Sequence, residues 1–167
     1  AKKDDELSVA LQGRALHRNF MGYATKPAPH MLAFGKSGIG DVCDRFVQND
    51  ATYDGWTAKM DAGGLPVVKG HKLNDDDKLR RLAILNLMCN LELPWSLTEE
   101  TYGAPANELL GESLKALPPL IEDGLAEMDA TGVRITEKGR YFVRNVAMIL
   151  DAYLGKGKGK PIFSKTV

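Results

Sequence analysis

Cysteine is scarce in this chain of 167 residues: Cys43 and Cys89 are its only two, and they lie far apart in the sequence. An iron–sulfur cluster needs three or four thiolates, and structural zinc sites use closely spaced pairs, so these two cysteines exclude both kinds of centre. Free cysteines are usually buried, which favours two structural thiols. The low cysteine content also predicts a reducing compartment without disulfides, and we expect a cytoplasmic protein.

Long apolar runs and an excess of charge of one sign are also missing. No apolar run approaches the roughly 18 to 20 residues of a membrane-spanning helix, and the polar start, Ala1 to Glu6, has no signal-peptide character. Lys and Arg together number 22, as do Asp and Glu, so no overall field attracts nucleic acid or an anionic membrane. We therefore expect neither as a partner. The missing initiator methionine fits a processed chain or a fragment.

The sequence offers no self-sufficient set of catalytic residues. Its three histidines are isolated, and it contains neither an HExxH zinc motif nor a GxSxG nucleophile motif. The acidic run 75–77 suits the positive end of a helix better than a metal site. The run 35–40 is rich in glycine but is no phosphate-binding loop, because position 30, where such a motif begins, is His. We expect no catalytic residue and no metal ligand in this chain.

Two parts, residues 1–50 and 51–167, differ in their patterns. The first part combines a short helix at 4–11 with a strand or loop at 18–25, and its glycine-rich run leads into a predicted helix at 41–48. The second part begins with a short helix at 54–62 and an extended linker at 65–73. We predict that the remainder is mostly α-helical with a small β-hairpin at 125–136.

Helix starts and stops in the second part can be assigned from single residues. Asn74 caps a helix that runs to about Leu93, where Pro94 stops it. Shorter helices are predicted from the following signals: a capping box at Ser96 and Glu99, a stop at Gly103, a start at Pro105, an interruption at Pro118-Pro119 and a stop at Gly124. Thr136 caps the last helix, and residues 155–160, with alternating glycine and lysine, form a flexible tail.

The order helix, helix, hairpin, helix at 107–154 is winged-helix-like, with residues 130–132 as the wing. Such units often bind DNA through a basic helix. The helix before the wing is net acidic in this chain, which disfavours contact with phosphates.

The most specific motif of the chain is the segment 16–25, which reads LHRNFMGYAT. It follows Asp5-Glu6-Leu7 and precedes the glycine-rich run, and the segments 135–140 (ITEKGR) and 163–167 (FSKTV) come further on. In this combination, over nearly the whole chain, the sequence resembles the distal half of the oxygen-independent (anaerobic) coproporphyrinogen III oxidases, a family of the radical S-adenosylmethionine superfamily.

This resemblance implies an α/β parent protein in which a partial radical-SAM barrel precedes a helical C-terminal domain. Residues 1–50 would be the distal end of the barrel, and residues 51–167 the C-terminal domain over the active site. The family uses S-adenosylmethionine and a four-iron four-sulfur cluster to convert two propionates of coproporphyrinogen III into vinyls, giving protoporphyrinogen IX in haem biosynthesis. The CxxxCxxC loop that holds the cluster is absent here. We therefore expect a fragment that is inactive alone and whose partner is the missing N-terminal barrel.

The resemblance also assigns cofactor contacts. Ile39, Gly38 and Gly35 fall on the segment that contacts S-adenosylmethionine in the family, with Ile39 on the adenine side. This chain departs from the family pattern nearby, because Gly38 stands for the usual Ala, and Gly40 and Asp41 stand for the usual Ser and an apolar residue.

Substrate contacts are expected to be cationic, because coproporphyrinogen III carries four carboxylates. Arg18 is the first candidate for binding one of them, with Arg14 and Lys26 as weaker candidates.

Two alternatives stay open at this point. One is a haem carrier of the same superfamily, which usually has an Asn-Tyr-Trp segment where this chain has Asn19-Phe20-Met21. The other is a free-standing winged-helix binding module. In every case we expect the first 50 residues to expose apolar surface, or to cover it in a non-native dimer of the fragment.

Overall fold

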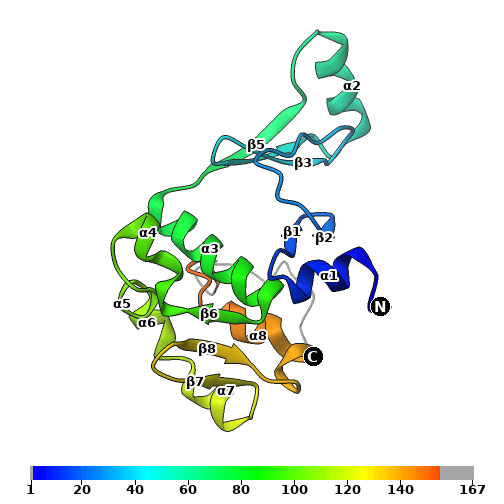
Figure 1. Cartoon of the computed structure of the whole chain (residues 1–167). Helices are drawn as coiled ribbons and strands as arrows, with labels where there is room; N and C mark the ends of the chain where they lie inside the picture. Colours follow the sequence, from blue (N-terminus) through cyan, green and yellow to red (C-terminus); the bar gives the residue numbers. More distant parts are fainter. Residues whose placement is uncertain (1, 155–167) are drawn as a thin grey trace.

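The computed structural model describes residues 2–154. The predicted flexible tail at 155–160 and the family-like ending at 163–167 lie outside the described residues. Figure 1 shows two lobes, which the chain joins through residues 26–30 and through the N-terminal end of the long helix α3 (Asp75–Asn90). We call residues 31–72 the sheet lobe, and residues 73–154, with residues 2–25 packed against α3, the core lobe.

The sheet lobe contains a three-stranded antiparallel sheet in the order β3-β4-β5. Its strands are β3 (Ile39–Val42), β4 (Arg45–Asn49) and β5 (Val67–Lys72), and helix α2 (Tyr53–Asp61) lies between β4 and β5 along the chain. The helix predicted at 41–48 is therefore wrong. Cys43 and Asp44 both have positive φ, 49° and 59°, so they form a two-residue turn of the kind that closes a hairpin.

The segment predicted as a linker at 65–73 is extended, as expected, but β5 within it pairs with β4. A division at residue 50 would separate these two paired strands. The predicted helix at 54–62, in contrast, is confirmed as α2, with Thr52 accepting a hydrogen bond from the Gly55 N–H at its start.

Helix α3 begins as the sequence predicts. The Asn74 side chain accepts a hydrogen bond from the Asp77 N–H at 2.8 Å, and the Asp77 carboxylate accepts one from the Asn74 N–H at 2.9 Å. The helix ends earlier than predicted, at Asn90, because Leu91 adopts a left-handed conformation with φ 62°. The following residues form strand β6 (Glu92–Pro94), which pairs with β8 (Gly132–Ile135), so Pro94 ends a strand and not the helix.

The rest of the core lobe is built from short elements. They are the 3₁₀ helix η1 (Trp95–Thr98), α4 (Glu99–Tyr102), α5 (Ala106–Leu109), α6 (Gly111–Leu114), α7 (Pro118–Glu122), β7 (Ala126–Met128), the 3₁₀ helix η2 (Gly139–Phe142) and α8 (Val143–Met148). The predicted hairpin is confirmed as β7-β8, and it joins β6 in a sheet of order β6-β8-β7. The predicted stops at Gly103 and Gly124 are confirmed, but the capping box at Ser96 and Glu99 does not form.

Helix α1 (Glu6–Gln12) and the hairpin of β1 (His17–Asn19) and β2 (Gly22–Ala24) precede the sheet lobe along the chain. Ala10 and Leu16 pack with Cys89 of α3, and the Tyr23 hydroxyl donates to the Met88 carbonyl at 3.3 Å. The described residues thus form a mixed structure of helices and three small sheets, and the expectation of a mostly helical chain with one hairpin is corrected.

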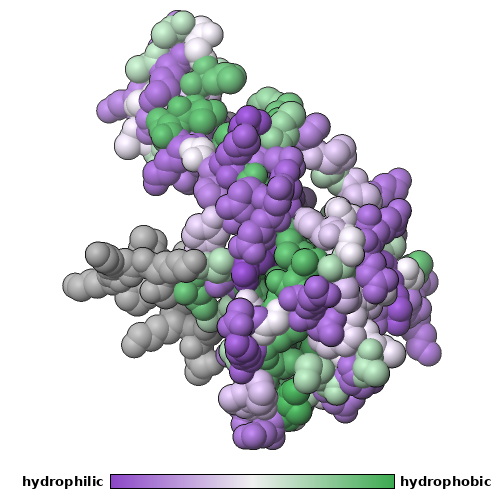
Figure 2. Space-filling view, turned by 90° about the vertical axis from the view of Figure 1, so that its left-hand side faces the viewer, coloured by the Kyte–Doolittle hydropathy of each residue, from purple (hydrophilic) through white to green (hydrophobic). Residues whose placement is uncertain are grey.

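The apolar core belongs to the core lobe. Its fully buried side chains include those of Leu87, Leu93, Leu110, Leu117 and Leu150. The sheet lobe has no comparable cluster, and Figure 2 shows apolar side chains on its surface as well as in a band that runs down the core lobe. The expected exposure of apolar surface in the first 50 residues is confirmed, since Met21 and Phe34 are about nine-tenths exposed.

Candidate functional site

A cleft of about 740 Å³ lies where the two lobes meet. The hairpin β1-β2, the sheet β3-β4-β5, helix α3 and the segment after α8 all contribute to it. Its lining residues are Arg18, Asn19, Phe20, Asp41, Phe46, His71, Leu73, Asp77, Arg80, Arg81, Ile84, Leu85, Leu150, Asp151, Ala152 and Tyr153. A cleft of this size, mostly apolar with a few polar groups, is typical of a small-molecule site.

Aromatic rings form one wall of the cleft. Phe20 from β1-β2 meets Phe46 of β4 edge to face, with ring centroids 5.4 Å apart. The Arg81 guanidinium of α3 lies over the Phe46 ring, 5.2 Å from its centroid. Contacts of these two kinds each stabilise the arrangement by roughly 0.5–1.5 kcal/mol, so the wall joins both lobes.

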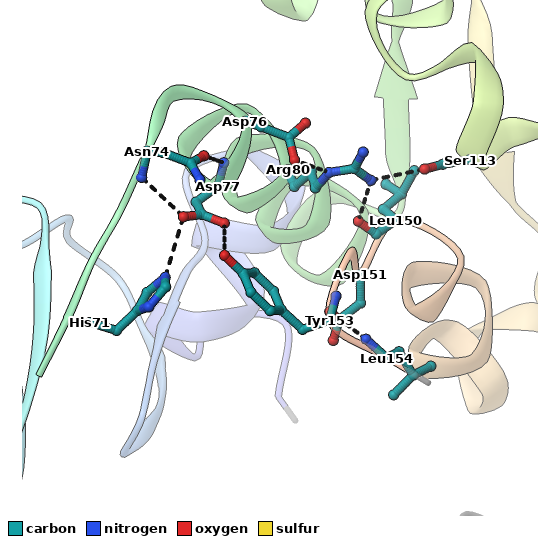
Figure 3. Close-up of polar contacts among 10 residues, drawn as sticks. All are labelled: His71, Asn74, Asp76, Asp77, Arg80, Ser113, Leu150, Asp151, Tyr153 and Leu154. Atoms are coloured by element: carbon teal, nitrogen blue, oxygen red, sulfur yellow. Dashed lines mark hydrogen bonds and ion pairs between the residues drawn. The ribbon is translucent and has the colours of Figure 1, made fainter. Parts of the chain in front are cut away.

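Three arginines reach the cleft, and two of them already have partners. Arg80 donates from Nε to Asp76 at 2.8 Å, and from one terminal nitrogen to the Ser113 hydroxyl at 2.8 Å and the Leu150 carbonyl at 2.9 Å (Figure 3). Arg81 donates from both terminal nitrogens to the two carboxylate oxygens of Asp41.

Arg18 is different from the other two. Its guanidinium lies over the Tyr23 ring, 5.4 Å from the centroid. Among residues 2–154, no side-chain hydrogen bond or ion pair joins this guanidinium to an acceptor. Within the described part of the chain, Arg18 is therefore the one arginine of the cleft without an acceptor, and it can bind a carboxylate.

A buried carboxylate organises the part of the cleft around His71, which is the cross-strand neighbour of Phe46. Asp77 accepts hydrogen bonds from the Asn74 N–H at 2.9 Å, the Tyr153 hydroxyl at 2.8 Å and His71 Nε2 at 3.3 Å (Figure 3). The Asn74 N–H, followed by the two side-chain donors, holds the pKa of Asp77 below its ordinary value although burial opposes the shift. The ionised carboxylate ties β5, α3 and the segment after α8 together.

The predicted cofactor contacts lie elsewhere in the sheet lobe. Ile39 begins β3 and is partly exposed, and neither it nor Gly38 nor Gly35 lines the cleft. A Cβ on Gly38 would lie 3.0 Å from the Ala33 Cβ, so an alanine there would require a small shift of the loop. Gly35 has φ +83° and open space around it. The structure thus brings Arg18 to the cleft and leaves the Gly35–Ile39 segment as a separate, accessible edge.

The weaker candidate Arg14 is already engaged, because it forms an ion pair with Glu92 at 3.0 Å. The residues of this chain do not fit an iron–sulfur cluster. Cys43 is exposed in the β3-β4 turn, Cys89 is buried in α3, and residues 2–154 contain no group of three His, Cys, Asp or Glu side chains placed to hold a metal ion. Burial raises the pKa of the Cys89 thiol, which suits a structural role. No described helix is both long and apolar enough to cross a membrane.

Several cleft residues were missed in the sequence. Phe46 was placed on a predicted helix, and His71 in a predicted linker. Tyr153 lies in a segment, 151–154, that resembles the family, but no role was predicted for it, because its link to Asp77 spans 76 positions along the chain. Asp77 was correctly interpreted as a helix-start residue, but its second role in joining three segments was not foreseen.

Comparison with known proteins gives one family match and several relatives. Residues 73–142 match the family model of the HemN C-terminal domain. The chain is 36% identical over all of its length to the oxygen-independent coproporphyrinogen III oxidase of Salmonella typhimurium and 38% identical to that of Helicobacter pylori, and covers 36% of each. It spans about a third of the length of these curated relatives.

A solved structure gives the same answer for the fold. The chain superimposes with a TM-score of 0.87 and 37% identity on a structure described as coproporphyrinogen III oxidase (HemN) from Escherichia coli, a radical SAM enzyme. The match covers 92% of this chain and 35% of that one. The resemblance seen in the sequence is therefore confirmed.

Proposed function

We propose that this chain is the C-terminal part of an oxygen-independent coproporphyrinogen III oxidase. The whole enzyme would oxidatively decarboxylate two propionates of coproporphyrinogen III to vinyls, giving protoporphyrinogen IX in the cytoplasm. The observation that carries the proposal is the alignment of all 167 residues, at 36% identity, with a relative of that name. The same names favour an oxidase over the haem carrier and over a free-standing winged-helix module.

Within this proposal, Arg18 binds one propionate carboxylate of the substrate. The support comes from its position in the cleft without an acceptor among the described residues, next to the apolar wall of Phe20 and Phe46. An arginine–carboxylate pair beside apolar rings is strong, because neighbouring water is displaced. The rings then offer an apolar surface to the macrocycle.

The Gly35–Ile39 segment would contact S-adenosylmethionine. The partly exposed Ile39 side chain and the open space at Gly35 support this role, since both are accessible. S-adenosylmethionine and a four-iron four-sulfur cluster would supply the oxidising radical chemistry in the whole enzyme, and the cluster ligands would come from polypeptide outside this chain.

The domain assignment is part of the proposal. Residues 1–50 would complete the distal end of the radical-SAM barrel, and residues 51–167 would form the C-terminal domain that covers the substrate. The strand order β6-β8-β7, with short helices between β6 and β7, supports a winged-helix-like description of that domain.

The proposal is tested with the full-length protein that contains this chain, purified without oxygen. We expect it to convert coproporphyrinogen III to protoporphyrinogen IX when supplied with S-adenosylmethionine and a reductant, as measured by chromatography of the oxidised porphyrins. Arg18→Gln should lower kcat/KM by about tenfold to a hundredfold, as expected for a lost charged hydrogen bond. Arg144→Gln, which removes an exposed arginine of α8 outside the cleft, is the matched control.

Two further measurements separate the alternatives. The 167-residue chain alone should show neither cluster absorbance nor turnover. If the full-length protein forms no protoporphyrinogen but binds haem with a sharp Soret band, the carrier function replaces the oxidase. Salt-dependent binding of DNA by the chain would instead favour the winged-helix module.

A further inference from the structure

The cleft restricts how many carboxylates it can bind. Of its three arginines, Arg80 is held by Asp76, Ser113 and the Leu150 carbonyl, and Arg81 by Asp41. Arg18 alone among them has no acceptor within residues 2–154. Among the described residues, a ligand with several carboxylates therefore meets one arginine without an acceptor and two that are neutralised by aspartates of the protein itself.

Asp41 is fixed in position by the backbone. It lies on β3 opposite Phe46, and its N–H and carbonyl pair with the carbonyl and N–H of Met31 at 2.9 and 2.8 Å. Its side chain is 18% exposed and uses both oxygens for Arg81. By the resemblance described above, this position is usually apolar, so the carboxylate is a feature of this chain.

Displacing Asp41 from Arg81 is unfavourable. A ligand carboxylate that bound Arg81 would leave the Asp41 charge unpaired in a partly buried place, next to a second negative charge. The Arg81 guanidinium is also held by the Phe46 ring, over which it lies. An uncharged, apolar edge of a ligand meets no such cost at this wall.

We propose that Asp41 is a specificity-determining residue of the cleft: by occupying Arg81, it directs a carboxylate to Arg18 and leaves the Phe46 wall for an uncharged edge of the ligand. This inference rests on the proposed function, because the ligand is taken to be a carboxylated tetrapyrrole. It deepens that function by stating which part of the tetrapyrrole faces which side of the cleft.

The test measures porphyrin binding to the 167-residue chain by fluorescence titration. Coproporphyrin III, with four carboxylates, is compared with deuteroporphyrin IX, with two. Asp41→Asn keeps the shape of the side chain and a hydrogen-bond acceptor but removes the charge. It should raise the affinity for coproporphyrin III by about tenfold and that for deuteroporphyrin IX by less, since Arg81 becomes a second anchor. The double variant Asp41→Asn, Arg81→Gln should lose this gain.

Asp44→Asn is the matched control. Asp44 forms an ion pair with Lys78 at 3.0 Å across the same junction of the lobes, but neither residue lines the cleft. Loss of the Asp44 charge should leave the ratio of the affinities for coproporphyrin III and deuteroporphyrin IX unchanged. Circular dichroism checks that every variant is folded.

Each outcome bears on the inference. Suppose that binding depends on Arg18 but Asp41→Asn does not change the ratio of the affinities for the two porphyrins. This result overturns the inference and leaves the proposed function standing. A gain that persists in the double variant also overturns it, because Arg81 would not be the second anchor. If neither porphyrin binds the wild-type chain, or if Arg18→Gln has no effect on binding, the inference falls together with the substrate contact proposed for Arg18.

Discussion

The core lobe buries a continuous apolar cluster, whereas the sheet lobe buries almost nothing. Between residues 17 and 72, only Gly40, Asn49 and Pro66 are buried, and every residue of β5 is exposed. The sheet lobe is held by backbone ladders and by polar links to α3, such as Lys78–Asp44 and Arg81–Asp41. Polar links of this kind stabilise far less than a packed core. The cleft thus lies between a firmly folded body and a weakly held extension.

Hydrogen exchange should show the difference between the lobes most strongly. Amides of α3 should exchange only through global unfolding, while those of β3, β4 and β5 should exchange through local opening, with an opening free energy lower by about 3 kcal/mol or more. Residues 31–72 should therefore be weakly protected compared with 75–90. Equal protection in both segments would show that the sheet lobe is as stable as the core lobe, and would contradict the proposed difference in stability between the lobes.

Core substitutions should sharpen the same comparison. Leu87 of α3 is 2% exposed and belongs to the apolar cluster. Leu87→Ala should lower the free energy of unfolding by about 2–5 kcal/mol, because the lost contacts leave a cavity. Leu65→Ala, at an 83% exposed leucine of the sheet lobe, is the control and should change it by less than about 0.5 kcal/mol. Urea unfolding measures the change in the free energy of unfolding for both variants. Similar decreases would mean that the sheet lobe contributes a core of its own.

Local signals predicted the core lobe better than the sheet lobe. Asn74 and Asp77 are three positions apart and fix the start of α3 within one turn, so the local sequence is enough to predict it. The glycine stops at Gly103 and Gly124 are equally local. The end of α3 was misplaced because β6 forms only by pairing with β8, about 40 residues later.

The sheet lobe depends on pairing that no local pattern reveals. The segment 41–48 was predicted as a helix, but it forms the end of β3 and most of β4, which pair with each other, and the other partner of β4, β5, follows only after α2. The turn between β3 and β4 has left-handed residues at Cys43 and Asp44, and neither is a glycine, so the sequence does not indicate a turn there. The candidate site shares this problem: the family motif placed Arg18, but Phe46, His71 and Tyr153 reach the cleft only through the tertiary fold.

The weakest effect we predict concerns the link between Tyr153 and Asp77 at the junction of the lobes. Tyr153→Phe removes the 2.8 Å hydrogen bond and keeps the ring that packs on His71, so the free energy of unfolding should fall by about 1 kcal/mol at pH 7. Tyr141→Phe is the matched control, because Tyr141 is 88% exposed and its hydroxyl has no partner within residues 2–154.

The difference between Tyr153→Phe and the wild-type chain should depend on pH at both extremes. The pKa of Asp77 is lowered in the fold, first by the Asn74 N–H and then by donors that include Tyr153, so its contribution is complete above the ordinary value of 3.8 and is lost as pH falls below it. The pKa of Tyr153 is raised, mainly by its hydrogen bond to Asp77, so its contribution is complete below the ordinary value of 10.0 and is lost as pH rises through the raised value. Urea unfolding should therefore show that the difference in the free energy of unfolding between the two proteins is constant from about pH 5 to 9. This difference should become smaller below and above that range. A difference that stays the same at pH 3 would mean that Asp77 is not the acceptor that holds the segment after α8 against α3.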